Sequence, residues 1–341
     1  MPAFLRKPYV YTAIFSTVLA LFFLYTLLLV FVIPRRADSE NILFEPFTGE
    51  VETGWGNNTP DPANPPQAGP DDSLFIAEGD PLIITDNLYV DEEIRIEISK
   101  LRRYDSDVYV ADIRLKDPTL LKTALARDKQ GNRFGMNIKE KTSVIANRVG
   151  AILAVNGDFY GSNESGYVIR NGVLFRDTLR PAADSGSDLA YFDDLAIMWD
   201  GSFITFDEKD FSAKEVKAKG AMHVLTFGPT LVKNREIAVD VNAEVGLAWS
   251  KTGNPRCAIG YVSPGHYLII VVDGRCDASR GTSLWELADI FRELGAETAY
   301  NLDGGGSATM IFNGKLINTP YTNWNKPSGE RRVSDIVYIG H

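Results

Sequence analysis

An uncharged run of 25 residues, Tyr9 to Ile33, constrains the architecture of this chain more than any other feature. The run contains VLALFFLYTLLLVFVI and has two basic residues on each side. As an α-helix it would be about 37 Å long, enough to cross a hydrocarbon core of about 30 Å with some tilt. A cleaved signal peptide is the alternative, but its apolar region is normally shorter and ends in small residues. The sequence therefore predicts a transmembrane helix at residues 9–33.

The segments around this run define the expected domain organisation. Residues 1–8 are expected to be a cytoplasmic tail, because long domains that follow such a helix translocate largely regardless of charge. Residues 34–80 contain GWGNNTPDPANPPQAGPDD, a composition that buries too little apolar surface to order itself and is typical of a stalk. We therefore expect a single-pass protein of the cell membrane whose folded domain, residues 81–341, is extracytoplasmic.

The folded domain shows short strand patterns interrupted by few helices. Alternation predicts strands at Ile94–Ile98 and Val108–Ile113, and Asn-Gly and Asp-Gly turns predict hairpins at Ile169–Leu174 and Ile197–Ile204. Helices are expected at Thr142–Arg148, Glu208–Lys219 and Ser283–Leu294. The last is amphipathic, with Thr282 or Ser283 as its N-cap and Gly295 at its end. The sequence thus predicts one α+β domain built on a mixed sheet with a few helices.

The charge balance makes nucleic acid an unlikely partner. Residues 1–36 hold four of the 35 Lys and Arg and none of the 45 Asp and Glu, which leaves 31 positive against 45 negative side chains. A net negative field repels polyanions unless a basic pocket overrides it, and no run of Lys or Arg is present. We therefore expect no nucleic acid to bind.

Three acidic residues each follow an apolar, strand-like run: Asp158, Asp273 and Asp303. A strand fixes the backbone while the following loop exposes the carboxylate, so carboxylates at several strand ends can converge on one site. The alternative is that each begins a turn, because Asp-Gly is a common turn dipeptide. These carboxylates are also the candidate ligands for a Ca²⁺ or Mg²⁺ ion, since hard cations prefer oxygen ligands. The identity of any metal is unknown from the sequence, and none is required by the expected chemistry.

The densest signal is the segment Asn301–Met310, NLDGGGSATM. Three successive glycines are costly to order, and their expected use is close backbone approach to a ligand with amides that bind an anion. The segment is not a P-loop, because no Gly-Lys-Ser/Thr follows and ATMIF reads as a strand. A bulged hairpin turn is the structural alternative.

Six motifs in order resemble the phosphodiester glycosidase family, over roughly Leu153–Ile339. They are AVNGDFYG (Ala154–Gly161), TFGPTLVKN (Thr226–Asn234), PRCAIGY (Pro255–Tyr261), VVDGR (Val271–Arg275), RGTSLWELADIFRELGAETAYNLDGGGSATM (Arg280–Met310) and VSDIVYI (Val333–Ile339). The chain departs from the family at Cys257, where a hydroxyl or small residue is usual, and at Asp158, where many relatives have glycine. Asp158 would either add a carboxylate to the site or fill a turn.

The resemblance implies a hydrolase that releases a sugar from a glycosyl phosphodiester. Arg256 and Arg275 suit the phosphate, because guanidinium groups pair bidentately with phosphate oxygens. A carboxylate is needed to stabilise the oxocarbenium-like sugar or activate water. Asp303 is the first candidate, followed by Asp273 or Glu286, although Glu286 is equally explained as a helix cap. The expected substrate-binding residues are Arg256, Arg275, Asn156, Asp158, Asn301, Gly304, Gly305, Gly306 and Ser307.

The two cysteines, Cys257 and Cys276, flank a predicted hairpin that turns at Ser263–His266. An exported domain permits a disulfide between them, but register places Cys257 opposite about residue 272, so pairing requires the segment after Asp273 to fold back. Two buried thiols are the alternative.

The expected function is hydrolysis of a sugar phosphodiester in a cell-surface glycan, exopolysaccharide, teichoic-acid-like polymer or capped sugar phosphate. A phosphodiesterase that cleaves P–O on the same fold and a non-catalytic glycan-binding module are the alternatives. The carboxylates and arginines together argue against the binding module, because sugar binding alone more naturally uses aromatics with neutral polar partners.

Overall fold

The computed structural model describes residues 69–127, 134–181, 193–239 and 253–341. The predicted cytoplasmic tail, the transmembrane helix at residues 9–33 and the stalk up to residue 68 lie outside the described residues. Of the helices within the described ranges, none is both long and apolar enough to cross a membrane. All described residues belong to one compact unit, Pro62–His341.

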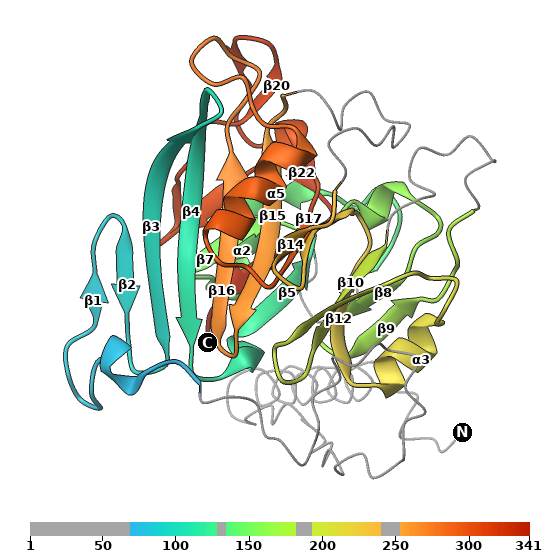
Figure 1. Cartoon of the computed structure of the whole chain (residues 1–341), viewed down its shortest axis with the longest axis horizontal. Helices are drawn as coiled ribbons and strands as arrows, with labels where there is room; N and C mark the ends of the chain where they lie inside the picture. Colours follow the sequence, from blue (N-terminus) through green and yellow to red (C-terminus); the bar gives the residue numbers. More distant parts are fainter. Residues whose placement is uncertain (1–68, 128–133, 182–192, 240–252) are drawn as a thin grey trace, which may run out of the picture. The chain divides into compact units, whose positions relative to one another are not determined.

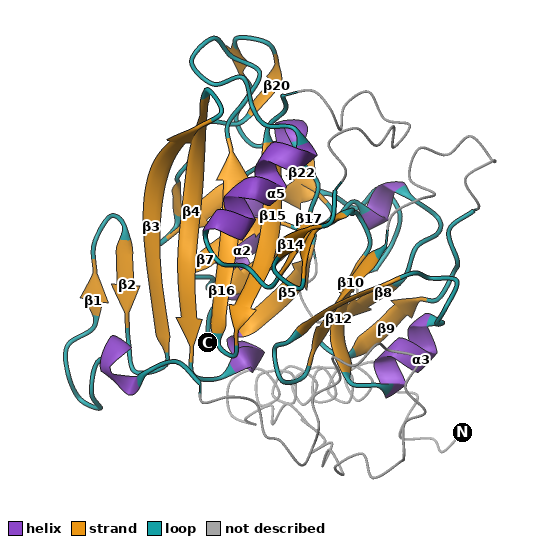
Figure 2. Ribbon diagram, viewed as in Figure 1, coloured by secondary structure: helices purple, strands orange, loops and turns teal. Residues whose placement is uncertain are grey.

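Within the described residues, three sheets contain most of the strands, and helices are few (Figures 1 and 2). The nine-stranded sheet consists, in spatial order, of β1 (Ile83–Ile84), β2 (Leu88–Val90), β3 (Ile94–Arg103), β4 (Ser106–Leu115), β16 (His266–Val272), β15 (Arg256–Ser263), β17 (Thr298–Asn301), β13 (Thr230–Lys233) and β14 (Glu236–Ile237). One five-stranded sheet consists of β11 (Phe203–Phe206), β10 (Asp194–Met198), β12 (Ala221–Leu225), β8 (Val168–Arg170) and β9 (Val173–Arg176). The other consists of β19 (Lys315–Leu316), β18 (Met310–Phe312), β7 (Leu153–Asn156), β23 (Asp335–Ile339) and β5 (Leu121–Leu125).

Two short ribbons complete the strands: β20 (Tyr321–Asn323) pairs with β21 (Lys326–Pro327), and β6 (Glu140–Lys141) pairs with β22 (Arg332–Val333). Each of the strand pairings recorded in the described ranges is antiparallel. Short 3₁₀ turns occur at Asp72–Leu74, Pro118–Leu120, Tyr160–Ser162 and Gly305–Ser307. The expected α+β class is confirmed, with strands dominating, but the expected single mixed sheet is wrong, because the described strands form several sheets with antiparallel pairings.

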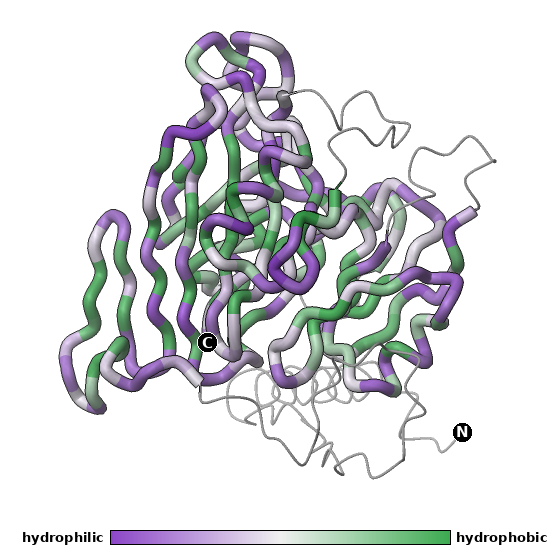
Figure 3. The backbone as a smooth tube through the Cα atoms, in the orientation of Figure 1, coloured by the Kyte–Doolittle hydropathy of each residue, from purple (hydrophilic) through white to green (hydrophobic). Residues whose placement is uncertain are grey.

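The main core lies between the nine-stranded sheet and the two five-stranded sheets. Ile259 of the first sheet belongs to the same buried cluster as Leu195 and Val155 of the other two. On the opposite face of the nine-stranded sheet, Leu287 and Phe291 belong to a second cluster. These residues lie in α5 (Leu284–Glu293), which crosses β15 and β17 in Figure 2. Hydrophobic residues accordingly run along the inner strands in Figure 3.

The helices follow their local capping signals. In α5, Ser283 is the N-cap and forms a capping box with Glu286, and Gly295 takes a positive φ just past the helix end. The helix α2 (Thr142–Val149) packs Ile145 against the sheet that contains β7 and β23. Helix α3 spans only Ala213–Ala218 instead of the predicted Glu208–Lys219. A capping box between Ser212 and Glu215 fixes its start, so the preceding residues are not helical.

The strand order brings the ends of several strands to one edge of the domain. In the nine-stranded sheet, Arg256 at the start of β15 lies opposite Val272 at the end of β16, and Ala258 lies opposite Asn301 at the end of β17. In the second layer, the start of β23 pairs with the end of β7. The chain passes from β17 in one layer to β18 in the other, so residues 302–309 cross between the two layers at this edge.

Candidate functional site

The segment 302–309 is held at the edge between the layers by Asn156. The Asn156 Nδ2 atom donates to the Asp303 carbonyl at 2.5 Å, and its Oδ1 accepts from the Thr309 amide at 3.2 Å. The Asp303 amide also donates to the Gly157 carbonyl at 3.2 Å. The fully buried Asn156 thus fixes both ends of the loop and contributes to the site by positioning Asp303.

Asp303 is a buried carboxylate with a cation beside it. Its exposed fraction is 8%, and Nη2 of Arg331 lies 3.4 and 3.5 Å from its two carboxylate oxygens. Arg331 Nε donates to the Ser307 hydroxyl at 2.8 Å. Burial raises the pKa of Asp303, while Arg331, Ser307 and the Gly304 amide act to lower it. A carboxyl group with a raised pKa in such a position suits proton transfer.

Two further arginines have atoms close to the same loop, Arg275 through its guanidinium and Arg256 through its backbone. Arg275 donates through Nη1 to the Thr322 carbonyl at 2.7 Å, and a Cβ atom added to Gly305 would lie 3.0 Å from Arg275 Nη2. Burial and the charge of Arg331 lower the pKa of Arg275. Arg256 is buried and donates through Nε to the Thr282 carbonyl at 2.9 Å. Burial and the charge of Arg275 lower its pKa to about 9, so it remains a cation at neutral pH.

These arginines give the edge a local positive charge in an otherwise acidic protein. The Arg275 guanidinium and the Arg256 backbone therefore lie beside the loop that carries Asp303. Arg331 contacts Asp303 directly, although the sequence motifs did not single it out. Its only signal was its position two residues before the VSDIVYI motif. A phosphate placed among guanidinium groups is the anion that this arrangement fits best.

The three glycines serve packing more than an anion nest. The Gly305 amide donates to the Pro255 carbonyl at 2.8 Å and is therefore occupied. A Cβ atom at Gly304 would lie 2.7 Å from the same carbonyl, and one at Gly306 would overlap the Thr322 hydroxyl. Because glycine has no side chain, the loop can pass between the start of β15 and strand β20, where there is no room for a Cβ atom. The sequence predicted that the amides of Gly304 and Gly305 would bind a ligand anion. In the structure the Gly305 amide binds the Pro255 carbonyl and the Gly304 amide binds Asp303.

Behind the loop lies a fully buried ion-pair network. Arg170 Nη2 contacts Asp158 Oδ2 at 2.7 Å and Asp335 Oδ2 at 2.8 Å. Asp158 also accepts from the amides of Tyr160 and Thr226. Asp158 is therefore a buried structural carboxylate that also shapes a turn, and its carboxylate is 1% exposed or less rather than presented to a ligand. Neither Arg170 nor Asp335 was singled out from the sequence, because their pairing depends on the packing of β8 on β23.

The other predicted carboxylates have separate partners. Asp273 accepts from Asn318 Nδ2 at 3.0 Å and from the Thr319 amide at 3.1 Å, so it fixes the chain beyond β19. Burial raises the pKa of Asp273. Glu286 accepts from the Ser283 amide at 2.8 Å and from Arg280 at 2.5 Å, which is the capping role that the sequence left open.

Asn301 is hydrogen-bonded within the fold through its Nδ2 atom, while its buried Oδ1 atom has no hydrogen-bond partner among the described residues. Its Nδ2 atom donates to the Gly228 carbonyl at 2.8 Å, and the residue is buried in β17. Asn301 therefore orders the end of the strand that carries Asp303, and we find no contact of its side chain with the Asp303–Arg331 pair in the described ranges.

The predicted disulfide between Cys257 and Cys276 is absent, because both are free, buried thiols. Cys257 lies within β15 opposite Val271, and its sulfur contacts the Asn156 carbonyl at 3.8 Å. Cys276 instead belongs to a tight turn in which its sulfur contacts the Ser279 carbonyl at 3.5 Å. After Asp273 the chain passes Pro255 at Gly274 and then makes the turn that joins Cys276 to Ser279, so the two thiols have different neighbours.

No group of three or more His, Cys, Asp or Glu side chains in the described ranges is arranged to hold a metal ion. The three carboxylates proposed as ligands contact Arg170, Asn318 and Arg331 respectively. These residues therefore do not fit a shared calcium or magnesium site.

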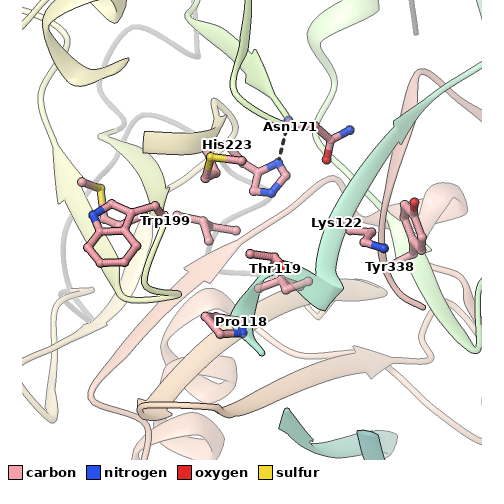
Figure 4. A pocket seen from close by; sticks show the side chains of 11 residues that line it. Pro118, Thr119, Lys122, Asn171, Trp199, His223 and Tyr338 are labelled. Carbon is pink, nitrogen blue, oxygen red and sulfur yellow. Dashed lines mark hydrogen bonds between the residues drawn. The ribbon is translucent and has the colours of Figure 1, made fainter. Parts of the chain in front are cut away.

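A pocket of about 290 Å³, drawn in Figure 4, has no residue of the Asp303 loop in its lining. Its walls include Trp199, Lys122, Tyr338 and His223. Figure 4 shows the Asn171 amide bonded to the His223 ring, at 3.2 Å. Burial lowers the pKa of His223 to about 3, so this imidazole is neutral. None of the predicted site residues lines the pocket.

A carboxylate flanked by arginines at the edge of a sheet-rich fold suits a hydrolase that acts on a phosphate ester. Comparison with known proteins identifies the family. The sequence profile of the family described as phosphodiester glycosidase matches residues 149–340. The chain belongs to this family. It is 31% identical over 220 residues to the SPbeta prophage-derived uncharacterized protein YomE of Bacillus subtilis (strain 168), covering 63% of this chain and 32% of that protein. It is also 31% identical over 205 residues to the human N-acetylglucosamine-1-phosphodiester alpha-N-acetylglucosaminidase, covering 55% of this chain and 37% of the enzyme.

The fold is shared with solved structures. The catalytic domain of the zebrafish N-acetylglucosamine-1-phosphodiester alpha-N-acetylglucosaminidase, auto-inhibited by its pro-peptide, aligns with a TM-score of 0.55 at 24% identity. That alignment covers 73% of this chain and 83% of the domain. A hypothetical protein from Synechocystis aligns with a TM-score of 0.51 at 15% identity, over 77% of this chain and 64% of that one. The chain spans about a third of the length of the two curated relatives named above.

Proposed function

We propose that this protein hydrolyses a glycosyl-1-phosphodiester, releasing a free sugar and leaving the phosphate on the other partner. The observation that carries the proposal is the buried Asp303 carboxylate beside Arg331, with the Arg275 guanidinium close to the same loop and Arg256 next to it at the start of β15. The family and the printed activity of its curated relatives support it.

In this mechanism the arginines bind the phosphate and Asp303 handles the proton. The phosphate is a weakly basic leaving group. Its departure therefore depends more on cationic side chains that bind it than on a strong proton donor. Water attacks the anomeric carbon, its proton passes to the Asp303 carboxylate, and the C–O bond to phosphate breaks. The electron pair of that bond leaves with the phosphate, whose added negative charge Arg275 and Arg331 stabilise.

Hydrolysis of N-acetylglucosamine-1-phosphomethyl ester in ¹⁸O-labelled water by the full-length protein tests the bond that breaks. Label in the free sugar is expected and means C–O cleavage. Label in the phosphate would make the protein a phosphodiesterase and overturn the glycosidase assignment.

Substitution of Asp303 tests the residue assigned to proton transfer. Asp303→Asn should lower turnover by about 10²- to 10⁴-fold, a range typical of a lost proton-transfer group. Asp112→Asn is the matched control, because Asp112 lies in β4 and pairs with His266 and Arg114. If both variants turned over at the wild-type rate, Asp303 would have no such role. Absence of turnover on a panel of glycosyl phosphodiesters, with glycan binding retained in Asp303→Asn, would favour the non-catalytic binding module.

We also propose that no resident metal ion is required. Dialysis of the full-length protein against EDTA should leave the turnover unchanged, because arginines supply the positive charge. A loss of turnover that added Ca²⁺ or Mg²⁺ restored would contradict this.

The location of the protein is proposed from the uncharged run at residues 9–33. We infer a single-pass protein of the cell membrane with its domain outside, acting on a cell-surface glycan or sugar phosphate. Protease added to intact cells should then degrade the domain, whereas protection on intact cells and degradation after lysis would mean the opposite orientation.

A further inference from the structure

The far end of the Asp303 loop is held by Asn318, a residue just beyond β19 that is 4% exposed. Its Nδ2 atom donates to the Ala308 carbonyl at 3.0 Å, and its Oδ1 atom accepts from the Met310 amide at 2.9 Å. One amide side chain thus binds the backbone on both sides of Thr309. Because the group is planar and buried, these two bonds fix the course of the chain where the loop enters β18.

Asp273 fixes the orientation of that amide group. Its Oδ1 atom accepts from Asn318 Nδ2 at 3.0 Å and from the Thr319 amide at 3.1 Å. The two hydrogens of Asn318 Nδ2 are therefore used, one on Asp273 and one on the Ala308 carbonyl. A flipped amide would point its oxygen at two acceptors, so only one orientation satisfies these partners. Asp273 directly follows β16, so the nine-stranded sheet holds the loop end of the other layer through Asn318.

The stretch of residues 308–310 is connected to the carboxylate of the site through Ser307. The Ser307 hydroxyl accepts from Arg331 Nε at 2.8 Å, and the Arg331 guanidinium contacts the Asp303 carboxylate. A shift of residues 308–310 would displace Ser307, which directly precedes them. The shift would then change the contact between Arg331 and Asp303.

We propose that Asn318 and Asp273 are positioning residues for the reaction. Asp273 orients the Asn318 amide, and that amide holds the loop in the geometry in which Arg331 meets the Asp303 carboxylate. The inference rests on the proposed function. It gives Asp273 the role of a hydrogen-bond acceptor instead of an acid or base of the reaction.

Asn318→Leu in the full-length protein tests this, because it keeps the branched shape and removes all three side-chain hydrogen bonds. On N-acetylglucosamine-1-phosphomethyl ester, kcat should fall about 30- to 100-fold, the order expected when a catalytic group is displaced by about 1 Å. KM should stay within about threefold of the wild-type value, since Arg275 is bonded to β20 and not to this stretch. The acid limb of the kcat/KM profile should move to higher pH, because Ser307 and Arg331 would lower the pKa of Asp303 less.

Thr123→Val is the matched control, because it also removes a buried hydrogen bond, between Thr123 Oγ1 and His223 Nδ1 at 3.1 Å. It should lower the thermal stability and leave kcat and the acid limb unchanged. Two further titratable groups interact with Asp303, namely Asp335 in β23 and Cys257 in β15, and neither belongs to the loop. An acid limb that stayed in place in Asn318→Leu, or moved equally in both variants, would overturn the inference.

Two substitutions of Asp273 test its role even if Asn318→Leu does not fold. Asp273→Asn and Asp273→Ala remove the same charge, but the first keeps an oxygen that can accept from Asn318 Nδ2. Asp273→Asn should keep kcat within about threefold of the wild type, and Asp273→Ala should lower it about tenfold or more. Equal effects of the two substitutions, large or absent, would overturn the inference. Equal losses as large as that of Asp303→Asn would make Asp273 a catalytic carboxylate.

Titration of the Asp303 carboxyl group without substrate separates this inference from the proposed function. The ¹³C NMR signal of that carboxyl carbon is assigned by its absence in Asp303→Asn. Its pKa should be higher in Asn318→Leu than in the wild type and unchanged in Thr123→Val. If no phosphodiester is cleaved but this shift is seen, the proposed hydrolysis fails and the positioning role stands. If the wild type cleaves the ester and Asn318→Leu changes neither kcat nor the titration, the positioning role fails and the hydrolase stands.

Discussion

Opposing effects act on the ionisation of Asp303. Burial favours the neutral acid, whereas Arg331 and Ser307 favour the carboxylate. Arg331 is itself 43% exposed at its side chain, so it can turn toward a bound phosphate without disrupting the core. We infer that Arg331 neutralises Asp303 in the free protein and the phosphate in the complex.

Replacing Arg331 should therefore move the pH dependence of activity. In the proposed mechanism Asp303 acts as a carboxylate, so activity should be present above its pKa and should be lost as the pH falls through that pKa. Arg331→Ala removes a charge that lowers the pKa of Asp303, so the acid side of the kcat/KM profile should move to higher pH. The plateau should fall about tenfold or more, because a charge-assisted bond to phosphate is lost.

Arg332→Ala is the control for this measurement, because Arg332 is the exposed neighbour in β22. It should leave the acid limb in place. An acid limb in Arg331→Ala that stayed fixed or moved to lower pH would show that Arg331 does not set the pKa of Asp303.

At the scale of single residues, the sequence indicated candidate residues for the site, but it left the role of several of them open. The sequence singled out Asp303 because it follows an apolar, strand-like run, and Arg256 and Arg275 because they lie in the family-like motifs and can pair with phosphate. Arg331 was missed because its contact with Asp303 spans 28 residues and follows no local pattern. Asp158 was found, but its burial against Arg170 depends on how two strands from different parts of the chain pack.

The glycine loop is the element on which the site depends most. It crosses from β17 to β18 between the layers, and it passes close to both the Pro255 carbonyl and the Arg275 guanidinium. Gly305 has a φ of +58°, a conformation in which a side chain is strained.

Gly305→Ala should therefore displace Arg275 and weaken phosphate binding. The added Cβ would lie 3.0 to 3.4 Å from three atoms of the guanidinium, so kcat/KM should fall about tenfold while the fold persists. Gly295→Ala is the matched control. Its φ is +85° and no atom lies within 4 Å of the added Cβ, so it should cost about 1 kcal/mol of stability and no activity. Equal loss of activity in both variants would show that backbone strain alone is responsible.

Local elements were predictable where turn and cap chemistry is strong. The Asn171-Gly172 turn joins β8 to β9, and Ser283 with Glu286 begins α5, as the sequence indicated. The role of Glu286 was left open because a first-turn carboxylate serves equally as cap or catalyst. The tight Cys276–Ser279 turn was not predicted, because no residue in it requires a special backbone conformation. The prediction of a disulfide to Cys276 was wrong for this reason.

At the scale of the whole molecule, the order of the strands within each sheet could not be predicted from the sequence. The nine-stranded sheet places β4 beside β16 and β17 between β15 and β13. These neighbours are far apart in the chain, and alternation along a strand says which face is buried but not which strand lies alongside. The strand assignments and the α+β class followed from local pattern, whereas the layering required the structure.

The layers are joined by buried charges as well as by apolar packing. Arg170 of β8 contacts Asp158 after β7 and Asp335 at the start of β23, and all three side chains are about fully buried. Two carboxylates share one guanidinium, and Asp335 Oδ1 has no hydrogen-bond partner in the described part of the chain. Burial raises the pKa of Asp335 to about 8, with the Asp158 charge acting in the same direction and Arg170 opposing it.

A raised pKa makes Asp335 a source of instability as the pH rises. The folded protein holds this proton up to about pH 8, whereas the unfolded chain releases it near the ordinary value of 3.8. The stability contributed by the protonated group is therefore present at low pH and is lost as the pH rises from about 4 to about 8. Asp335→Asn, which cannot ionise, should gain stability relative to the wild type over this range. The gain should be at most about 1.4 kcal/mol per pH unit and should level off above about pH 8.

Thermal unfolding of the full-length proteins between pH 5 and pH 9 measures this difference. Asp289→Asn is the control, because Tyr104 and Arg292 lower the pKa of Asp289, so that its carboxylate is ionised throughout the range. Its offset from the wild type should therefore stay constant with pH. A constant or shrinking gap for Asp335→Asn would mean that Asp335 is ionised in the fold at neutral pH. In that case Arg170 would balance both carboxylates, and the layers would be joined by three buried charges instead of an ion pair with a protonated acid.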